Sequence, residues 1–259
     1  NLLDAVLPPL PEQKKIASIL TSVDEVIEKT QSQIDKLQDL KKGTMNELLT
    51  KGIGHTEFKD SELGRIPKSW EVKKLEEIVR FRQGVQVDLE LQKSKPSKGY
   101  LPFLRIENYT QGSNDLRYIP EENARNAFVS FEDIVVVRYG ATAGFVGRGK
   151  SGILANNLFT VTPLDKSLIK PYLYLILKSS FQYFQDVMAG GAMPALNFGM
   201  ISSLVKSFPP VGEQNTIVDI LSSIDLKIVS LEKKLHQTQS LKKSLMQDLL
   251  TGKVRVSVN

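Results

Sequence analysis

Apolar residues recur at spacings of three, four and seven in two long stretches of the chain, one near each end. In the first stretch they are Ile16, Leu20, Val23, Ile27, Ile34 and Leu37. In the second they are Ile217, Leu221, Ile224, Ile228, Leu231 and Leu235. This heptad-like spacing places an apolar stripe along one face of a helix. We therefore predict long helices over 8–52 and 209–252, each entered through Pro-Pro and ended near a glycine.

The two helical stretches are copies of one sequence, 201 residues apart. PPLPEQKKIASILTSVDEVI begins at Pro8, PPVGEQNTIVDILSSIDLKI begins at Pro209, and the copies stay in register as far as Thr50 and Thr251. Roughly forty helical residues rise about 60 Å, so each stripe needs a long partner to cover it. The other copy is the obvious partner. We predict that the two helices pair as an antiparallel coiled coil through their stripe residues.

The segment between the copies has shorter and less regular patterns. Its first part, 53–64, is rich in glycine and polar residues and is predicted to be a linker, whereas 65–208 is predicted to be one mixed α/β domain. The expected strands are Leu101–Ile106, Ile134–Arg138, Thr142–Gly147 and Leu158–Val161, and the expected helices are Pro171–Met188 and Phe198–Leu204. The predicted fold class is therefore α+β, with one domain flanked by two long helices.

Positive charge is concentrated in this middle segment. Residues 65–208 carry 19 Lys and Arg against 13 Asp and Glu, whereas residues 8–52 carry seven of each sign. A basic domain on neutral helices favours a polyanionic partner for the domain. The chain has no cysteine, which is typical of a reducing compartment, and its apolar runs are too short to span a bilayer. We expect a cytoplasmic protein.

Catalytic motifs are missing from the sequence. It has no GxxxxGK[ST] phosphate loop, and its two histidines, His55 and His236, lack neighbours at metal-ligand spacing. Glu71-Val72-Lys73 has the spacing of a nuclease motif, but no convincing acid precedes it, and the start of an exposed strand or helix explains it more simply. We therefore expect no enzyme activity, no cofactor and no metal site.

The paired copies and the domain between them resemble a known family. Pro-Pro-x-x-Glu-Gln followed by an Ile-x-x-Ile-Leu helix and LKK…LL-Thr, found on both sides of a domain, is similar to the specificity subunit of type I restriction-modification systems. LGRIPKSWEVKKLEEI from Leu63 is similar to the start of that family's target-recognition domains, and FEDIVVVRYGATAGFVGR from Phe131 is similar to a later segment. The resemblance covers essentially the whole chain.

The resemblance implies a non-catalytic subunit that recognises double-stranded DNA and directs methyltransferase (modification) and restriction subunits to a bipartite target. Family members usually carry two target-recognition domains, and this chain shows one. Residues 1–7 are interpreted as the remnant of a preceding segment and residues 253–259 as a C-terminal tail. The chain is thus either a half-length subunit or a fragment. A homodimer related by a twofold axis is one way to complete the target.

Polar and basic loop residues of the middle domain are the candidates for DNA contact, because such side chains bind base edges and phosphates. They are Arg82, Gln83, Lys93, Lys95, Lys98, Arg105, Asn108, Tyr109, Tyr139, Thr142, Arg148, Lys150, Asn156, Gly191 and Asn197. For most of them a solvated turn is an equally good interpretation, whereas the three-lysine loop favours phosphate contact. The alternative function is a helical scaffold with only non-specific affinity for DNA, which the concentration of charge in the middle domain argues against.

Overall fold

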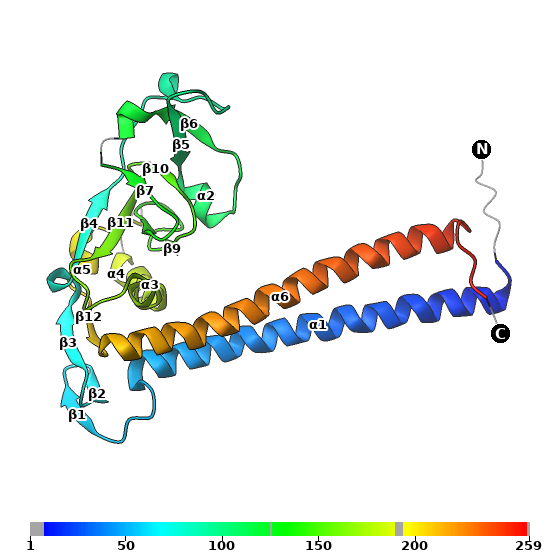
Figure 1. Ribbon diagram of the computed structural model, residues 1–259, viewed down its shortest axis with the longest axis horizontal. Coiled ribbons are helices and arrows are strands. Elements are labelled where there is room, and N and C mark those ends of the chain that lie inside the picture. The colour runs from blue at the N-terminus through cyan, green and yellow to red at the C-terminus, as the bar shows by residue number, and fades with distance from the viewer. Residues whose placement is uncertain (1–7, 125, 190–193, 258–259) are drawn as a thin grey trace. The chain divides into compact units, whose positions relative to one another are not determined.

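The computed structural model describes residues 8–124, 126–189 and 194–257 (Figure 1). Their contacts divide them into two compact units. One lies within Asn1–Met45 and Ile220–Asn259, which we call the helical hairpin, and the other is Asn46–Asp219, which we call the middle domain.

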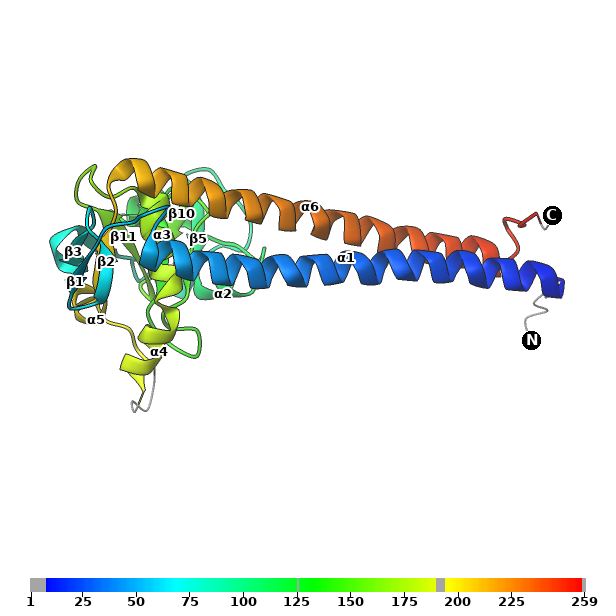
Figure 2. The same cartoon turned by 90° about the horizontal axis from the view of Figure 1, so that it is seen from below.

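The helical hairpin is built from most of α1 (Leu10–Lys51) and most of α6 (Val211–Leu250), and the remaining end of each helix belongs to the middle domain. The two helices run side by side in opposite directions in both views (Figures 1 and 2). Ile34, Ile228 and Leu231 form a buried cluster between them, with Leu37 and Leu235 packed against it. The predicted antiparallel coiled coil is confirmed.

Two ion pairs show that the hairpin has an internal twofold symmetry. Lys41 of α1 pairs with Asp225 of α6, and Lys242 of α6 pairs with Asp24 of α1, with 2.5 Å between Nζ and Oδ1 in the second pair. Lys242 stands 201 residues after Lys41, and Asp225 stands 201 residues after Asp24. The same contact is therefore made twice, once in each direction, which two copies of one sequence achieve only when they run antiparallel.

The stripe residues differ in how far they are covered. Those that are buried are Ile16, Ile34, Ile217, Leu221, Ile228 and Leu231. Those that are only half-buried are Leu20, Val23, Ile27, Leu37, Ile224 and Leu235. Leu20 and Ile27 keep some exposure because a pair of helices shields only one side of each seam residue and leaves the rim open to solvent.

The middle domain contains two four-stranded sheets with the orders β6-β5-β10-β7 and β4-β11-β8-β9, and two small sheets, β1-β2 and β12-β3. The strands are β1 (Phe58–Ser61), β2 (Gly64–Pro67), β3 (Glu71–Lys74), β4 (Val79–Gln83), β5 (Tyr100–Leu104), β6 (Arg117–Pro120), β7 (Phe128–Val129), β8 (Ile134–Val137), β9 (Val146–Gly147), β10 (Gly152–Leu154), β11 (Leu158–Pro163) and β12 (Val205–Phe208). The shorter helices are α2 (Ile106–Thr110), α3 (Lys170–Ser179), α4 (Phe181–Met188) and α5 (Phe198–Ser202).

Several boundaries differ from those expected. The stretch 53–64 contains β1 and the start of β2, a hairpin whose turn has Gly64 at a φ of 87°. Only the end of Thr142–Gly147 forms a strand, because Gly144 has a φ of 86° and lies in a turn. The single helix expected over Pro171–Met188 is two helices that meet at Ser180.

The two four-stranded sheets are joined through Gly84 and the residue after it. Val85 forms a parallel bridge with Ala155, and its amide donates to the Leu154 carbonyl at 2.8 Å. A Cβ on Gly84 would lie 2.1 Å from the carbonyl oxygen of Ala155, far inside van der Waals contact. Only glycine therefore lets the two segments approach this closely.

We expect Gly84→Ala to destabilise the protein by about 1–3 kcal/mol, because backbone atoms rather than a flexible side chain must move to admit the methyl group. Gly43→Ala is the control: nothing lies within 4 Å of its Cβ position inside α1, and alanine there should stabilise the helix by about 0.5–1 kcal/mol. Urea unfolding followed by the fluorescence of the buried Trp70, the chain's one tryptophan, measures the first change, and ellipticity at 222 nm measures the second. Equal midpoints for Gly84→Ala and the unchanged chain would contradict the steric argument.

Side chains at the start of α6 tie this end of the helix to the domain around it. Gln214 is fully buried, accepts from the Ile169 amide at 3.0 Å, and donates to the carbonyls of Ser167 and Pro209. Glu213 accepts from Trp70 Nε1 at 3.0 Å and from the Ile53 amide, and lies 2.8 Å from His55 Nε2. The Glu-Gln pair at the start of the second copy therefore holds the first turn of α6 to the rest of the middle domain.

Candidate nucleic-acid interface

Polar residues gather at one end of the β4-β11-β8-β9 sheet. In its antiparallel register, Gln83 at the end of β4 pairs with Phe159 near the start of β11, and Leu158 pairs with Val137 at the end of β8. The loops that follow β4 and β8 and the loop that precedes β11 therefore meet at the same end. Sequence-predicted residues from three separate segments are brought together there: Gln83, Tyr139, Thr142 and Asn156.

Side-chain amides link two of these loops. Gln83 Nε2 donates to the Asn156 carbonyl at 3.0 Å, and Asn156 Nδ2 donates to Gln86 Oε1 at 2.6 Å. Gln83 and Gln86 are exposed and Asn156 is half-buried. We call these three residues the amide cluster. It presents hydrogen-bonding groups to solvent on a backbone fixed by the close approach at Gly84, and so can bind a polar partner with little loss of side-chain freedom.

The turn after β8 adds a cation beside the amide cluster. The Arg138 amide donates to the Asn157 carbonyl at 2.9 Å, and the Arg138 guanidinium lies 4.8 Å from the centre of the Tyr139 ring and 5.8 Å from that of Phe198. Within the described ranges no carboxylate pairs with Arg138. Its charge is thus held by aromatic faces and remains available to an anion.

Asn197 lies close to the same turn. The Leu196 amide donates to the Arg138 carbonyl at 2.8 Å, and the exposed Asn197 caps α5 by accepting from the Met200 amide at 2.9 Å. Gly191, another sequence candidate, lies outside the described residues.

The three-lysine loop lies apart from the amide cluster, beside the other four-stranded sheet. Lys93 bridges Tyr118, and its Nζ lies 3.8 Å from the centre of the Tyr100 ring. Lys93, Lys95 and Lys98 are all exposed, and none is paired with a carboxylate in the described part of the chain. The loop therefore carries three solvated positive charges.

Arg148 and Lys150 follow β9, whose end lies at the opposite end of its sheet from the amide cluster. Arg148 is exposed and its guanidinium lies 4.4 Å from the centre of the Tyr174 ring on α3. Arg148 and Lys150 therefore do not belong to the surface that carries the amide cluster.

Arg105, Asn108 and Tyr109 support the structure from inside. Asn108 is fully buried, accepts from the Arg105 amide at 2.7 Å and donates to the carbonyls of Ser113 and Asp115. The Arg105 guanidinium pairs with Glu107 at 2.8 Å. Burial raises the pKa of Tyr109 far above its ordinary value. Asn108 is therefore closed off from solvent, whereas Arg105 and Tyr109 are half-buried. Sequence reasoning could not foresee this burial because all three residues follow a strand in a polar segment.

A second basic surface combines one predicted residue, Arg82, with Arg80, which the sequence analysis missed. Arg80 and Arg82 lie on one face of β4, opposite Thr162 and Thr160 of β11, and line a cavity of about 550 Å³ with Lys170 and Asp133. Arg82 donates to the Phe128 carbonyl at 2.8 Å. Burial alone would raise the pKa of Asp133, but the bonds from Lys170 and Ser130 lower it below its ordinary value. The alternation of arginines at 80 and 82 was the available clue.

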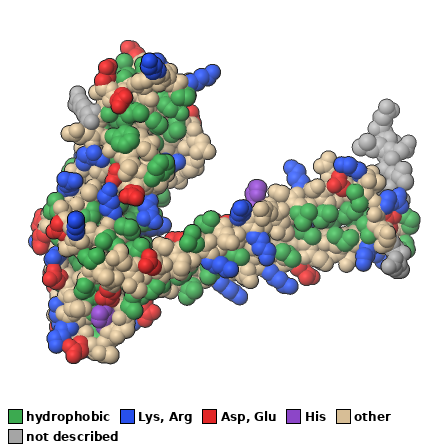
Figure 3. All heavy atoms as spheres, in the orientation of Figure 1, with side chains coloured by type: hydrophobic (Ala, Val, Ile, Leu, Met, Phe, Trp, Pro, Cys, Tyr) green, Lys and Arg blue, Asp and Glu red, His purple; other side chains and the backbone are tan. Residues whose placement is uncertain are grey.

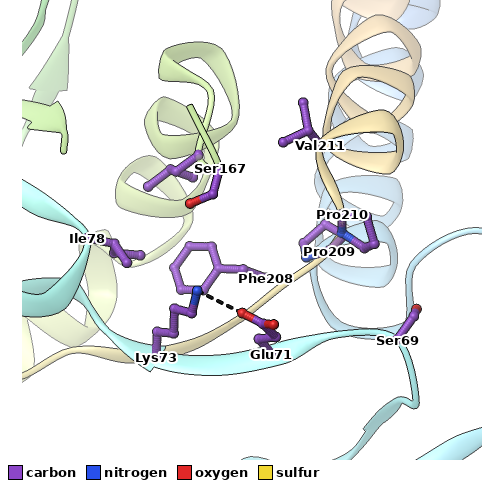
Figure 4. A pocket seen from close by; sticks show the side chains of 10 residues that line it. Ser69, Glu71, Lys73, Ile78, Ser167, Phe208, Pro209, Pro210 and Val211 are labelled. Carbon is purple, nitrogen blue, oxygen red and sulfur yellow. Dashed lines mark ion pairs between the residues drawn. The ribbon is translucent and has the colours of Figure 1, made fainter. Parts of the chain in front are cut away.

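Another cavity, of about 250 Å³, lies beside the start of α6 (Figure 4). Lys73 and Glu71 point toward one another at its edge, 2.7 Å apart, next to Phe208. The sequence Glu71-Val72-Lys73 is thus part of strand β3, and its charged groups satisfy each other. The described residues include no group of three or more His, Cys, Asp or Glu side chains arranged to hold a metal ion. Of the described helices, none is both long and apolar enough to cross a membrane.

Comparison with known proteins gives matches along the chain. The model of a family described as "Type I restriction modification DNA specificity domain" matches residues 67–240. The chain is 31% identical to the type I restriction enzyme MjaVIII specificity subunit of Methanocaldococcus jannaschii, over 96% of this chain and 62% of that protein. It is 34% identical to the putative type I restriction enzyme MjaX specificity subunit of the same organism, over 96% and 59%. The chain spans about three fifths of the length of these relatives.

Solved structures show the same fold. The crystal structure of a type I restriction-modification system S subunit from M. genitalium superposes with a TM-score of 0.62 at 17% identity, over 97% of this chain and 62% of that one. A structure of a type I R-M system, described for its complex assembly and conformational transition, gives 0.66 at 17% identity, over 96% and 61%. The α+β fold class, with long paired helices, is thereby confirmed.

Proposed function

This chain belongs to the family of type I restriction-modification DNA specificity domains, and on that premise we propose that it is a non-catalytic subunit that recognises a specific DNA sequence. In this proposal it directs methyltransferase and restriction subunits to one part of a bipartite target. The observation that carries the proposal is the amide cluster with Arg138 beside it at one end of the β4-β11-β8-β9 sheet. Amides and guanidinium groups are the side chains that hydrogen-bond base edges and phosphates.

The remaining basic groups would hold the DNA backbone. Lys93, Lys95 and Lys98 are exposed, and Arg80 and Arg82 line a groove. Phosphate contacts of this kind supply sequence-independent affinity, whereas the amide cluster would supply discrimination between bases. Arg105, Asn108 and Tyr109 would act by holding their loop in place.

The flank of the helical hairpin supports docking of partner subunits. Residues seven apart lie along one edge of each helix next to the seam. On α1 this edge includes Ile19, Val26 and Leu40, and Leu40 is 55% exposed. On α6 it includes Leu241, the copy of Leu40, which is 53% exposed. Exposed hydrophobic side chains along the hairpin are visible in Figure 3. Such a surface is typical of protein contact sites, and the presence of its leucine on both helices fits two equal partners such as methyltransferase subunits.

The start of α1 resembles an anchor for a second recognition domain. Glu12, the copy of Glu213, accepts two hydrogen bonds from the Arg255 guanidinium and one from the Val256 amide. The Arg255 bonds first, and then the Val256 bond, lower the pKa of Glu12 below its ordinary value. Gln13, the copy of Gln214, donates to the Pro8 carbonyl at 2.7 Å but is exposed, whereas Gln214 is fully buried by the middle domain. We propose that a second copy of this chain, or a further domain, completes the target there.

Mapping of methylated bases tests the function. In cells that contain the partner subunits, we expect removal of this gene to abolish methylation at a set of sites that share one interrupted motif. A palindromic motif would favour two copies of this chain, and a motif with two different halves would favour a separate recognition domain. A methylation pattern that is the same with and without the gene would contradict the proposal. The matched control is the same strain with the unchanged gene restored.

A further inference from the structure

The hydrogen bond between Asn156 and Gln86 determines which of their polar groups remain free. Asn156 Nδ2 and Gln86 Oε1 are used in their mutual hydrogen bond of 2.6 Å. The groups left over are the Asn156 Oδ1 acceptor and the Gln86 Nε2 donor, on a half-buried and an exposed side chain. If both amides were turned around, the pair would again leave one acceptor and one donor. The linked pair therefore offers one donor and one acceptor side by side.

The four base pairs differ in what they show in the major groove. Adenine shows the N7 acceptor next to the N6 donor, guanine shows two acceptors, cytosine shows one donor, and thymine shows one acceptor and a methyl group. Adenine alone has an adjacent acceptor and donor on one base. Resting on the DNA-recognition function proposed above, we infer that the Gln86–Asn156 pair recognises an adenine, with Gln86 donating to N7 and Asn156 accepting from N6.

The surroundings fix this pair more firmly than a single amide is usually fixed. The Gln83 side chain donates to the Asn156 carbonyl at 3.0 Å, and Val85 bridges Ala155, so both loops are held on either side of the pair. A lone exposed glutamine can rotate to exchange its oxygen and nitrogen, and so accepts different bases. Here such a rotation of one amide alone would break the 2.6 Å bond and place like groups together. The pair therefore selects for one pattern.

Arg138 would hold the DNA backbone beside this adenine. Its amide is bonded to the carbonyl of Asn157, the residue after Asn156, and its guanidinium has no carboxylate partner within the described residues. A phosphate contact made by this guanidinium would position the base step without adding sequence information.

The test selects preferred sites from random duplex DNA with the full chain and then measures binding to the selected sequence. Replacement of one adenine by 7-deazaadenine, which lacks N7 but still pairs with thymine, should weaken binding by about tenfold at one position. In the Gln86→Ala variant, which has already lost the N7 contact, the same replacement should cause no further loss. Gln111→Ala, which removes an exposed amide elsewhere in the domain, should behave like the unchanged chain.

A second variant keeps the size of the side chain and changes its chemistry. Gln86→Glu removes the donor, and a carboxylate accepts from the N4 amino group of cytosine, so selection should shift from adenine to cytosine at that position. If the unchanged chain selects no sequence, the proposed function itself is overturned. If it selects a sequence and every variant retains the same preference at every position, only the assignment of this pair is overturned. Trp70 fluorescence shows that each variant is folded.

Discussion

Ile228→Asp is expected to lower the free energy of unfolding of the helical hairpin by about 2–4 kcal/mol, because it places a charge without a partner in an apolar seam. Ile228 is 7% exposed and packs in one cluster with Ile34 and Leu231. Denaturant unfolding followed by ellipticity at 222 nm measures the change.

The next residue provides the control for this substitution. Val229 is 60% exposed, so Val229→Asp adds the same charge outside the seam and should change stability by less than about 0.5 kcal/mol. If the two variants unfold at the same denaturant concentration, the seam contributes little, and the pairing of the helices must depend on their ion pairs.

Replacement of Lys93, Lys95 and Lys98 by alanine is expected to weaken DNA binding for every sequence and to flatten its dependence on salt. If the unchanged chain neutralises roughly five phosphates, the slope of log affinity against log salt is about −4 to −5, and loss of three contacts raises it by about 2 to 3. Fluorescence anisotropy with labelled duplexes over a range of salt concentrations measures both quantities.

An equal loss of charge on the hairpin is the matched control. Lys14, Lys29 and Lys36 are exposed residues of α1, and alanine at these three positions lowers the net charge by the same amount. We expect their replacement to leave the slope unchanged. A slope that is unchanged in the Lys93, Lys95 and Lys98 variant would remove that loop from the interface, and equal changes in both variants would mean that only net charge matters.

The helices could be predicted from the sequence because their pattern is local and occurs twice. The spacing of Ile16, Ile34 and Ile228 needs no knowledge of the rest of the fold, and the repeated sequence names the partner. The site was less accessible to such reasoning. Gln86 and Asn156 are seventy residues apart in sequence, and they meet only because β4 and β11 pair in one register.

Burial explains one further difference between expectation and structure, and backbone conformation explains another. Asn108 is a polar residue in a polar segment, which favours exposure, yet its amide closes a turn and is fully buried. Gly140 and Gly144 were available as indications of a turn, but the apolar residues around them favoured a strand over Thr142–Gly147. Their φ angles of 87° and 86° determine the outcome.

The repeated ion pair of the hairpin means that each long helix is complementary to a reversed copy of itself. Asp24 and Lys41 stand on one helix. Asp24 contacts Lys242, the copy of Lys41, and Lys41 contacts Asp225, the copy of Asp24. A pair of α1 helices from two molecules would present the same charges to one another, in the same order. Exchange of helices between molecules would therefore preserve these two ion pairs.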